Sequence, residues 1–213
     1  MRQKNKVIFS FVMMLVTATS YSSEQSIPRE VSKFLDNESR VLSYKTGDLN
    51  KDGRQDAVVV IESIADDQEY GHARTLLVFL RNKKKNILEQ VVKNDNVIAC
   101  SKCSNYEPYP DPLSNGEIAL GKGMITITQY FDIRFNPSFS IYKFKYQPKT
   151  HKFKTIMARN IVFKLKQPEG EYRKYISNHV AQYGKSLDDF NPDWHNLKKI
   201  LDEDYDTNQK KGN

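Results

Sequence analysis

The sequence has little cysteine and lacks the short motifs that mark several enzyme classes. Two cysteines occur in 213 residues, both inside Cys100-Ser-Lys-Cys103, and there is no second CxxC. A zinc site needs two more ligands than this pair supplies, and the four histidines are scattered along the chain. Neither Gly-x-Ser-x-Gly nor His-Glu-x-x-His is present, so the signatures of α/β-hydrolases and zincins are missing. Tyr183-Gly-Lys-Ser186 is half of a phosphate loop, but the first glycine position falls on His179.

Long apolar runs are also scarce, and the one that stands out lies near the start of the chain. It covers residues 7–16, follows Arg2, Lys4 and Lys6, and leads into small residues. This order is typical of a secretory signal peptide, and a membrane-spanning helix needs about 20 residues. We therefore expect a signal peptide over residues 1–22 and a periplasmic or secreted mature protein without a membrane span. A single membrane anchor is the alternative. The candidate cleavage sites follow Ala18, Ser20 and Ser22.

If the protein is exported, the cysteine pair is best interpreted as a structural disulfide. Disulfides form and persist in oxidising compartments, so we predict a Cys100–Cys103 disulfide that pins a loop. The alternative is a redox pair, which would need the cysteines to open a helix. Three prolines follow within nine residues and argue against that helix. They are Pro108, Pro110 and Pro112.

The charge is basic but modest. The formal charge of +7 falls to +4 when Arg2, Lys4 and Lys6 leave with the signal peptide. Basic residues gather in residues 83–85 and 143–154, which we interpret as hairpin tips and solvated strand faces. Contact with an acidic partner or an anionic envelope polymer is the alternative. No nucleic-acid motif accompanies these residues, and we expect no nucleic-acid partner.

The stretch around which the chain is organised is an acidic loop at residues 48–56. Oxygen-bearing side chains occupy loop positions one, three, five and nine, and a glycine occupies position six. Calcium binds about six to eight oxygens, and this alternation supplies them from one side of a tight turn. The alternative is a polar turn capped by its own Asp and Asn side chains, without metal. The candidate ligands are Asp48, Asn50, Asp52, Arg54 through its carbonyl only, and Asp56.

This DxNxDGxxD pattern, followed by the apolar run 57–61, resembles the calcium loop of FG-GAP and VCBS-type repeats and the loop of dockerins. An EF-hand fits less well, because its twelfth position falls on Val59, which cannot ligate. One copy is present, so the resemblance does not extend to a propeller. The chain also resembles short exported bacterial proteins with a single loop of this kind. That resemblance implies export and a structural calcium ion, and it implies no activity.

Most of the mature chain alternates or runs in the manner of strands. We predict a central strand at 57–61, a second at 75–80, and a hairpin through the polar turn 82–86 into 87–92. Antiparallel strands at 124–131, 139–146 and 153–165 follow an irregular stretch from 94 to 116.

Helical spacing appears at both ends of the mature chain. Apolar residues in 27–35 predict a short helix over the sheet, and 172–176 is a further possible helix start. Asn191 and Pro192 begin a helix whose apolar stripe includes Trp194 and Leu197. The expected fold class is therefore α+β, a mainly antiparallel sheet with an N-terminal and a C-terminal helix packed on it. We expect one domain over residues 23–202 and a flexible tail over 203–213.

Two function classes follow. The first is a non-catalytic binding or interaction protein, including an inhibitor or immunity-type protein, that contacts an envelope or secreted partner. Its contact residues would be Tyr106 and Tyr109 in the cysteine loop, because tyrosine gives large contact area at low entropy cost. The second is a cell-envelope hydrolase that uses acidic residues. Adjacent acid pairs exist at 66–67, 188–189 and 203–204, but such pairs are commonly just solvated.

Overall fold

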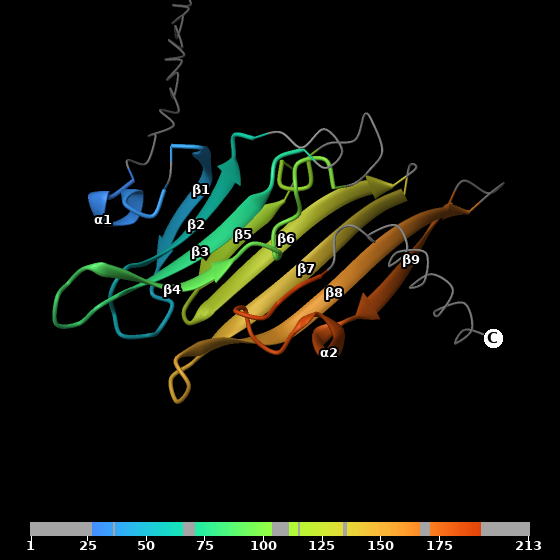
Figure 1. Cartoon of the computed structure of the whole chain (residues 1–213). Helices are drawn as coiled ribbons and strands as arrows, with labels where there is room; N and C mark the ends of the chain where they lie inside the picture. Colours follow the sequence, from blue (N-terminus) through green and yellow to red (C-terminus); the bar gives the residue numbers. More distant parts are fainter. Residues whose placement is uncertain are drawn as a thin grey trace, which may run out of the picture.

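The computed structural model describes residues 27–35, 37–65, 71–103, 111–114, 116–133, 136–166 and 171–192. Nine antiparallel strands account for most of these residues (Figure 1). The strands are β1 Ser39–Gly47, β2 Asp56–Ser63, β3 Arg74–Arg81, β4 Leu88–Asn94, β5 Glu117–Gly121, β6 Met124–Ile133, β7 Asn136–Gln147, β8 Lys152–Lys166 and β9 Glu171–Asn178.

The strands form two sheets in simple chain order. The first sheet has the order β1-β2-β3-β4 and the second β5-β6-β7-β8-β9, so every neighbour in a sheet is also a neighbour in sequence. The predicted central strand, hairpin and three later strands are confirmed as β2, β3–β4 and β6–β8. The apolar run in β2 is continuous because both faces of this strand are buried.

One core lies between the sheets, and a smaller one lies on the outer face of the first sheet. Val58, Val60, Leu76 and Val78 of the first sheet face the same cluster as residues of the second sheet. From the second sheet come Ile125, Ile127, Tyr142, Phe144 and Phe153, and the segment 183–190 closes the cluster with Tyr183, Leu187 and Phe190. The alternate residues of β2 and β3 join Val31 and Leu88 in the smaller cluster.

The sheets meet where β1 passes β5. Gly47 of β1 lies against Leu120 of β5 so closely that a Cβ on the glycine would be 3.3 Å from the Leu120 Cβ. The antiparallel order then sorts the connections into two groups. The β1–β2, β3–β4, β5–β6 and β7–β8 turns lie at one end of the molecule, which we call the turn end (Figure 1). The β2–β3 and β4–β5 connections lie at the other end, called the disulfide end.

The predicted α+β class is wrong: within the described residues the protein is a two-sheet antiparallel β protein. The N-terminal helix is only one turn, α1 Arg29–Ser32, and just Val31 of it is buried. A single turn has too few apolar positions to form a layer on a sheet. The predicted C-terminal helix from Asn191 onward falls almost wholly on residues 193–213, outside the described residues.

The possible helix at 172–176 is also wrong. These residues belong to β9, whose Ile176 pairs with Ile161 and whose Lys174 pairs with Phe163 of β8. Pairing along the long β8 strand overrides the weak helical spacing. Helix α2 Val180–Tyr183 follows directly and is again a single turn. None of the helices in the described part of the chain is long and apolar enough to cross a membrane.

Candidate functional site

The acidic loop lies at the turn end, and its side chains bind its own backbone. The Asp48 carboxylate accepts hydrogen bonds from the N–H groups of Asp52 (3.0 Å) and Gly53 (3.1 Å). The Asn50 side-chain oxygen accepts a second bond from the Asp52 N–H (2.9 Å), and Asp52 accepts one from Arg54 (3.0 Å). Gly53 has φ of 84°, the left-handed conformation for which glycine is favoured. The loop is therefore shaped by side-chain-to-backbone bonds.

Asp56 fixes this loop to the first sheet. It is fully buried, and one carboxylate oxygen accepts from the N–H groups of Leu49 (2.7 Å) and Asn50 (3.3 Å). The other oxygen accepts from the Arg81 N–H at the end of β3 (2.8 Å). Burial raises the pKa of Asp56 above its ordinary 3.8, although these three N–H groups oppose the shift. Asp56 is thus a structural link between the loop and two strands.

The Arg54 side chain has a role that the sequence reasoning missed. Its guanidinium donates to the main-chain carbonyls of Asn82 (3.4 Å) and Lys83 (3.1 Å) in the β3–β4 hairpin. The prediction gave this residue only a carbonyl role at loop position seven. The sequence carried no signal for the side-chain contact, because it depends on two connections lying side by side at the turn end.

The donor chemistry of the loop suits a hard cation. Each carboxylate oxygen has two lone pairs, so a bond from a backbone N–H leaves capacity for a metal. In the described ranges, however, no group of three or more His, Cys, Asp or Glu side chains is gathered so that it could hold a metal ion. The calcium role of Asp48, Asn50, Asp52, Arg54 and Asp56 therefore stays a prediction.

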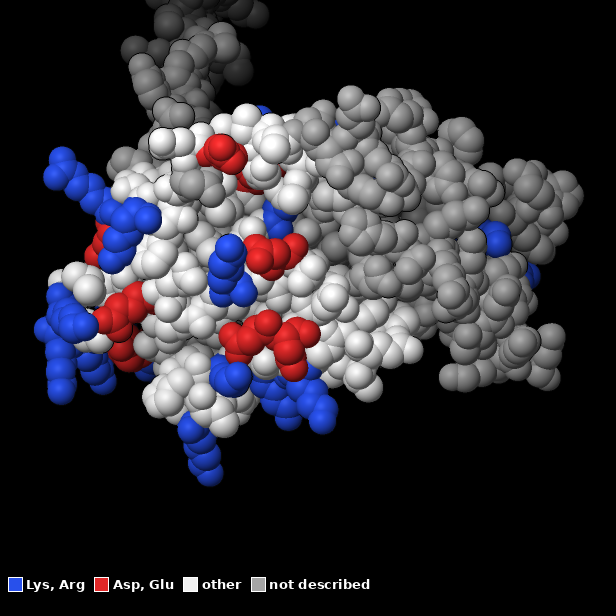
Figure 2. All heavy atoms as spheres, viewed as in Figure 1, with Lys and Arg blue, Asp and Glu red and all other residues white. Residues whose placement is uncertain are grey.

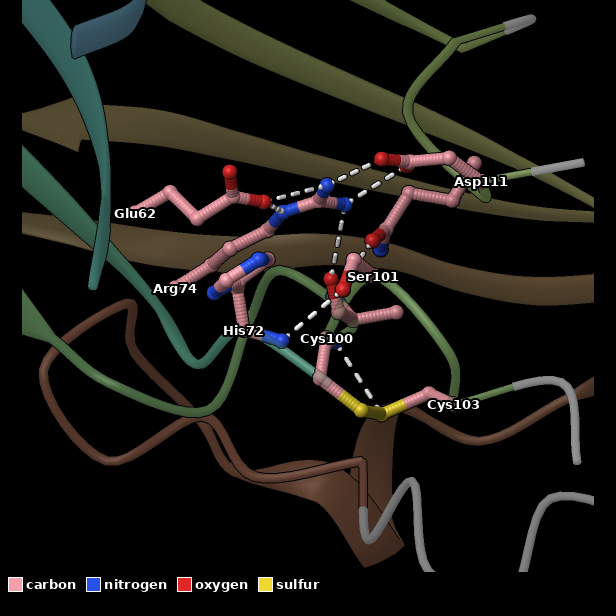
Figure 3. The surroundings of a disulfide bond; sticks show 9 residues. Glu62, His72, Arg74, Cys100, Ser101, Cys103 and Asp111 are labelled. Atoms are coloured by element: carbon pink, nitrogen blue, oxygen red, sulfur yellow. Dashed lines mark hydrogen bonds and ion pairs between the residues drawn. A yellow bond between two sulfur atoms is a disulfide. The ribbon is translucent and has the colours of Figure 1, made fainter. Parts of the chain in front are cut away.

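The cysteine pair lies at the disulfide end. The structure joins Cys100 and Cys103 by a disulfide, and Cys103 is buried in the core between the sheets (Figure 3). The turn between them contacts the start of the β3 region. The Ser101 N–H donates to the His72 carbonyl (3.2 Å), and the His72 N–H donates to the Ser101 hydroxyl (2.8 Å). The CxxC turn is therefore attached to the first sheet as well as to itself.

A buried arginine beside this turn joins three parts of the chain (Figure 3). The Arg74 guanidinium donates to Glu62 (2.9 Å from Nε and 2.7 Å from Nη2), and both side chains are almost completely buried. It also donates to the Ala99 carbonyl (3.1 Å) and to Asp111 (2.7 Å from Nη1). Ala99 precedes the disulfide, and Asp111 lies between Pro110 and Pro112. One side chain thus holds both ends of the cysteine loop against the first sheet.

The electrostatics of this cluster favour the charged form of Asp111. Burial alone would raise the pKa of Asp111, but hydrogen bonds and charge from Arg74 and bonds from the Leu113 and Ser114 region hold it below 3.8. Burial would lower the pKa of Arg74, and its bonds to Asp111 and Glu62 outweigh that effect and raise it. Arg40, more than half exposed, also donates to the second Glu62 oxygen (2.7 Å). The cluster is a satisfied ion-pair network.

The sequence analysis did not identify this cluster, although the positions of Glu62 and Arg74 in the sequence indicate that they pair. Glu62 directly follows the apolar run of β2, and Arg74 opens β3. In an antiparallel hairpin these two positions face each other, and the register pairs Glu62 with Arg74. A charge at the end of an otherwise apolar strand is therefore a sign of a partner on the next strand. Asp111 gave no such signal.

The two tyrosines predicted to bind a partner, Tyr106 and Tyr109, lie outside the described residues. Their segment, residues 104–110, connects Cys103 to Asp111, and the structure fixes both of these residues. The span of seven residues between two such anchors is the candidate binding element.

Of the adjacent acid pairs in the sequence, only Asp188 and Asp189 lie among the described residues. Asp188 pairs with Lys152 (3.3 Å). Slight burial would raise the pKa of Asp189, but bonds from Ser186 hold it below 3.8. A general acid at neutral pH needs a raised pKa. The pairs 66–67 and 203–204 lie outside the described residues.

Comparison with known proteins adds no assignment. No protein-family model, no curated protein and no solved structure matches this chain.

Proposed function

We propose that this protein is an exported, non-catalytic binding protein of the periplasm or the medium, of the inhibitor or immunity type. Its contact element is the segment 104–110 with Tyr106 and Tyr109, and its partner is an envelope or secreted protein. The acidic loop has a structural role and takes calcium there. The hydrolase alternative gains no support from the acids described above.

The observation that carries this proposal is the anchored base of the segment. A disulfide fixes Cys103 directly before the segment, and the buried Arg74 holds Asp111 directly after it and Ala99 before the disulfide. Binding residues commonly lie on loops that a rigid scaffold positions. A fixed base lowers the entropy lost when the loop binds, so a short segment with two tyrosines gains affinity from its support.

Tyrosine suits this role for physical reasons. Its ring contributes large apolar contact area with few rotatable bonds, and its hydroxyl can bind at a wet interface rim. The neighbouring sequence, Asn105, Glu107 and three prolines, supplies polar groups and a restricted backbone. A segment of this composition suits contact with a partner protein better than contact with a small molecule.

The experiment is partner capture from cell-envelope extract, with the wild type and a Tyr106→Ala/Tyr109→Ala variant as immobilised baits. The matched control is Tyr172→Ala, which removes an exposed tyrosine (52 % exposed) from β9. We expect the wild type and the control to retain the same protein, and the double variant to lose it. If all three baits retain identical proteins, the segment is not the contact element. Turnover of an envelope polymer by the purified protein would reject the non-catalytic assignment.

A further inference from the structure

The turn end carries a strong excess of positive charge. Its four connections, residues 48–55, 82–87, 122–123 and 148–151, contain seven Lys or Arg and two Asp. The described connections of the turn end are therefore strongly basic, although the whole chain is only moderately basic. In Figure 2, blue side chains project at the left and lower margins, where Figure 1 places the β3–β4 and β7–β8 hairpins.

Hydrogen bonds join these four connections into one surface. Arg54 reaches from the acidic loop to the Lys83 carbonyl in the β3–β4 hairpin (3.1 Å). The Gly123 N–H of the β5–β6 turn donates to the Asp48 carbonyl (3.0 Å). The Tyr146 N–H beside the β7–β8 hairpin donates to the Gly123 carbonyl (3.0 Å). The positive groups thus belong to a fixed array that spans both sheets.

Close packing between the loop and a turn supports this continuity. The Lys51 side chain crosses Gly123, so a Cβ added to this glycine would lie 2.7 Å from the Lys51 Cε. Gly123 also has φ of 73°, which a residue with a side chain rarely adopts. The two connections therefore hold a defined position relative to each other.

Most of the positive charge at this end is not paired with an acid in the described parts of the chain. Five lysines are exposed there, and no ion pair joins them to a described acid. The acids of the loop face other groups, since Asp48 and Asp52 accept bonds from backbone N–H groups. The five lysines, called the lysine array, are Lys51, Lys83, Lys84, Lys122 and Lys149.

We propose that the lysine array docks this protein on a membrane surface that contains anionic phospholipids. The lysines belong to four separate turn tips that project from the strand ends. A plane of phosphates can contact all four tips together, because they lie at the same end of the strands. Each lysine near such a surface strengthens binding about fivefold at low salt, and the effect weakens as salt screens the charges. Docking by this end points the disulfide end away from the membrane.

The experiment is co-sedimentation of the purified protein with phosphatidylcholine vesicles, with and without phosphatidylglycerol. Two variants divide the array, Lys83→Gln/Lys84→Gln and Lys122→Gln/Lys149→Gln. We expect binding only to the anionic vesicles and a loss of about 25-fold in partition for each variant. Raising the salt from about 0.02 M to about 0.5 M should remove binding. The matched control is Lys93→Gln/Lys174→Gln, which makes the same charge change on β4 and β9 and should cost little.

Three results would overturn the proposal. Equal partition to neutral and anionic vesicles would show that charge does not direct binding. An equal loss in the control would show that net charge matters and the array does not. Binding to soluble polyphosphate without binding to anionic vesicles would assign the array to a polymer instead of a membrane. Circular dichroism of the variants, which change exposed residues only, checks that each is folded.

Discussion

The turn end and the disulfide end hold their connections in opposite ways. At the turn end, the acids accept bonds from backbone N–H groups and the lysines extend into solvent. At the disulfide end, the acids Glu62 and Asp111 pair with one buried arginine, and a covalent bond closes the nearby turn. The lysines at the turn end are exposed to solvent, whereas the Arg74 side chain at the disulfide end is buried. The comparison indicates that the first end suits a long-range electrostatic surface and the second a fixed support for a short binding segment.

Arg74 should give the largest effect on stability. Replacing it with methionine (Arg74→Met) leaves Glu62 buried without its main partner, so we expect a loss of about 3–5 kcal/mol in the free energy of unfolding. Arg40→Met is the matched control, since Arg40 also pairs with Glu62 but is exposed, and it should cost about 0–1 kcal/mol. Urea denaturation measures both. Equal losses would mean that burial does not distinguish the two arginines.

Asp56 should give the second largest effect, and it is the buried exception at the turn end. Asp56→Asn keeps the shape but places an NH₂ group against backbone N–H donors, so we expect a loss of about 1–3 kcal/mol. Asp48→Asn changes an acid of the same loop that is only half buried, and its effect should be smaller. Urea denaturation at neutral pH compares them. A larger effect from Asp48 would contradict the role of Asp56 as the link to the sheet.

The pH dependence of stability should have opposite signs at the two ends. The pKa of Asp56 is raised above 3.8, so ionisation of this group at neutral pH costs stability. Lowering the pH through its folded pKa toward 3.8 protonates the group and restores that stability. The pKa of Asp111 is lowered, so its contribution is complete above 3.8 and is lost as the pH falls below 3.8 through its folded pKa. As the pH falls toward 3.8, the free energy of unfolding of the wild type should therefore increase relative to that of Asp56→Asn.

Against Asp111→Asn, the wild type should instead lose its advantage below pH 3.8. Denaturant titrations of the three proteins across this pH range measure both differences. Slopes of the same sign for the two variants would show that the two carboxyl groups do not differ as described.

Calcium should give the smallest effect. Extracellular loops of this type bind calcium at about 10⁻⁴–10⁻³ M. At about 10 mM calcium, a dissociation constant of about 1 mM adds about 1.4 kcal/mol, which raises Tm by about 3–5 °C. Asp48→Ala/Asp52→Ala should remove the shift in a thermal melt, while magnesium should reproduce little of it. An unchanged Tm for the wild type would leave the loop as a turn capped by its own side chains.

The sequence predicted local features at both ends, and it missed the contacts between residues far apart in the chain. Local patterns identify the acidic loop, its Gly53 bend and the polar hairpin at 82–86, because each depends on residues close in the chain. The contact of Arg74 with Asp111 joins residues 37 positions apart, and no local pattern encodes it. The fold class failed for a related reason. The apolar spacing in 172–176 looks helical alone, but strand pairing decides its structure. The helix predicted in 27–35 does form, but only as the single turn α1.

The most direct test of the anchored-segment account is the affinity for the captured envelope protein, measured by biolayer interferometry. Cys100→Ser/Cys103→Ser releases the base of the segment without changing Tyr106 or Tyr109, and Lys83→Gln/Lys84→Gln changes only the turn end. We predict that the first variant binds at least about tenfold more weakly, since each 1.4 kcal/mol of lost pre-organisation is a factor of ten. The second variant should bind like the wild type. Equal affinity of the cysteine variant and the wild type, or a comparable loss in the lysine variant, would contradict the account.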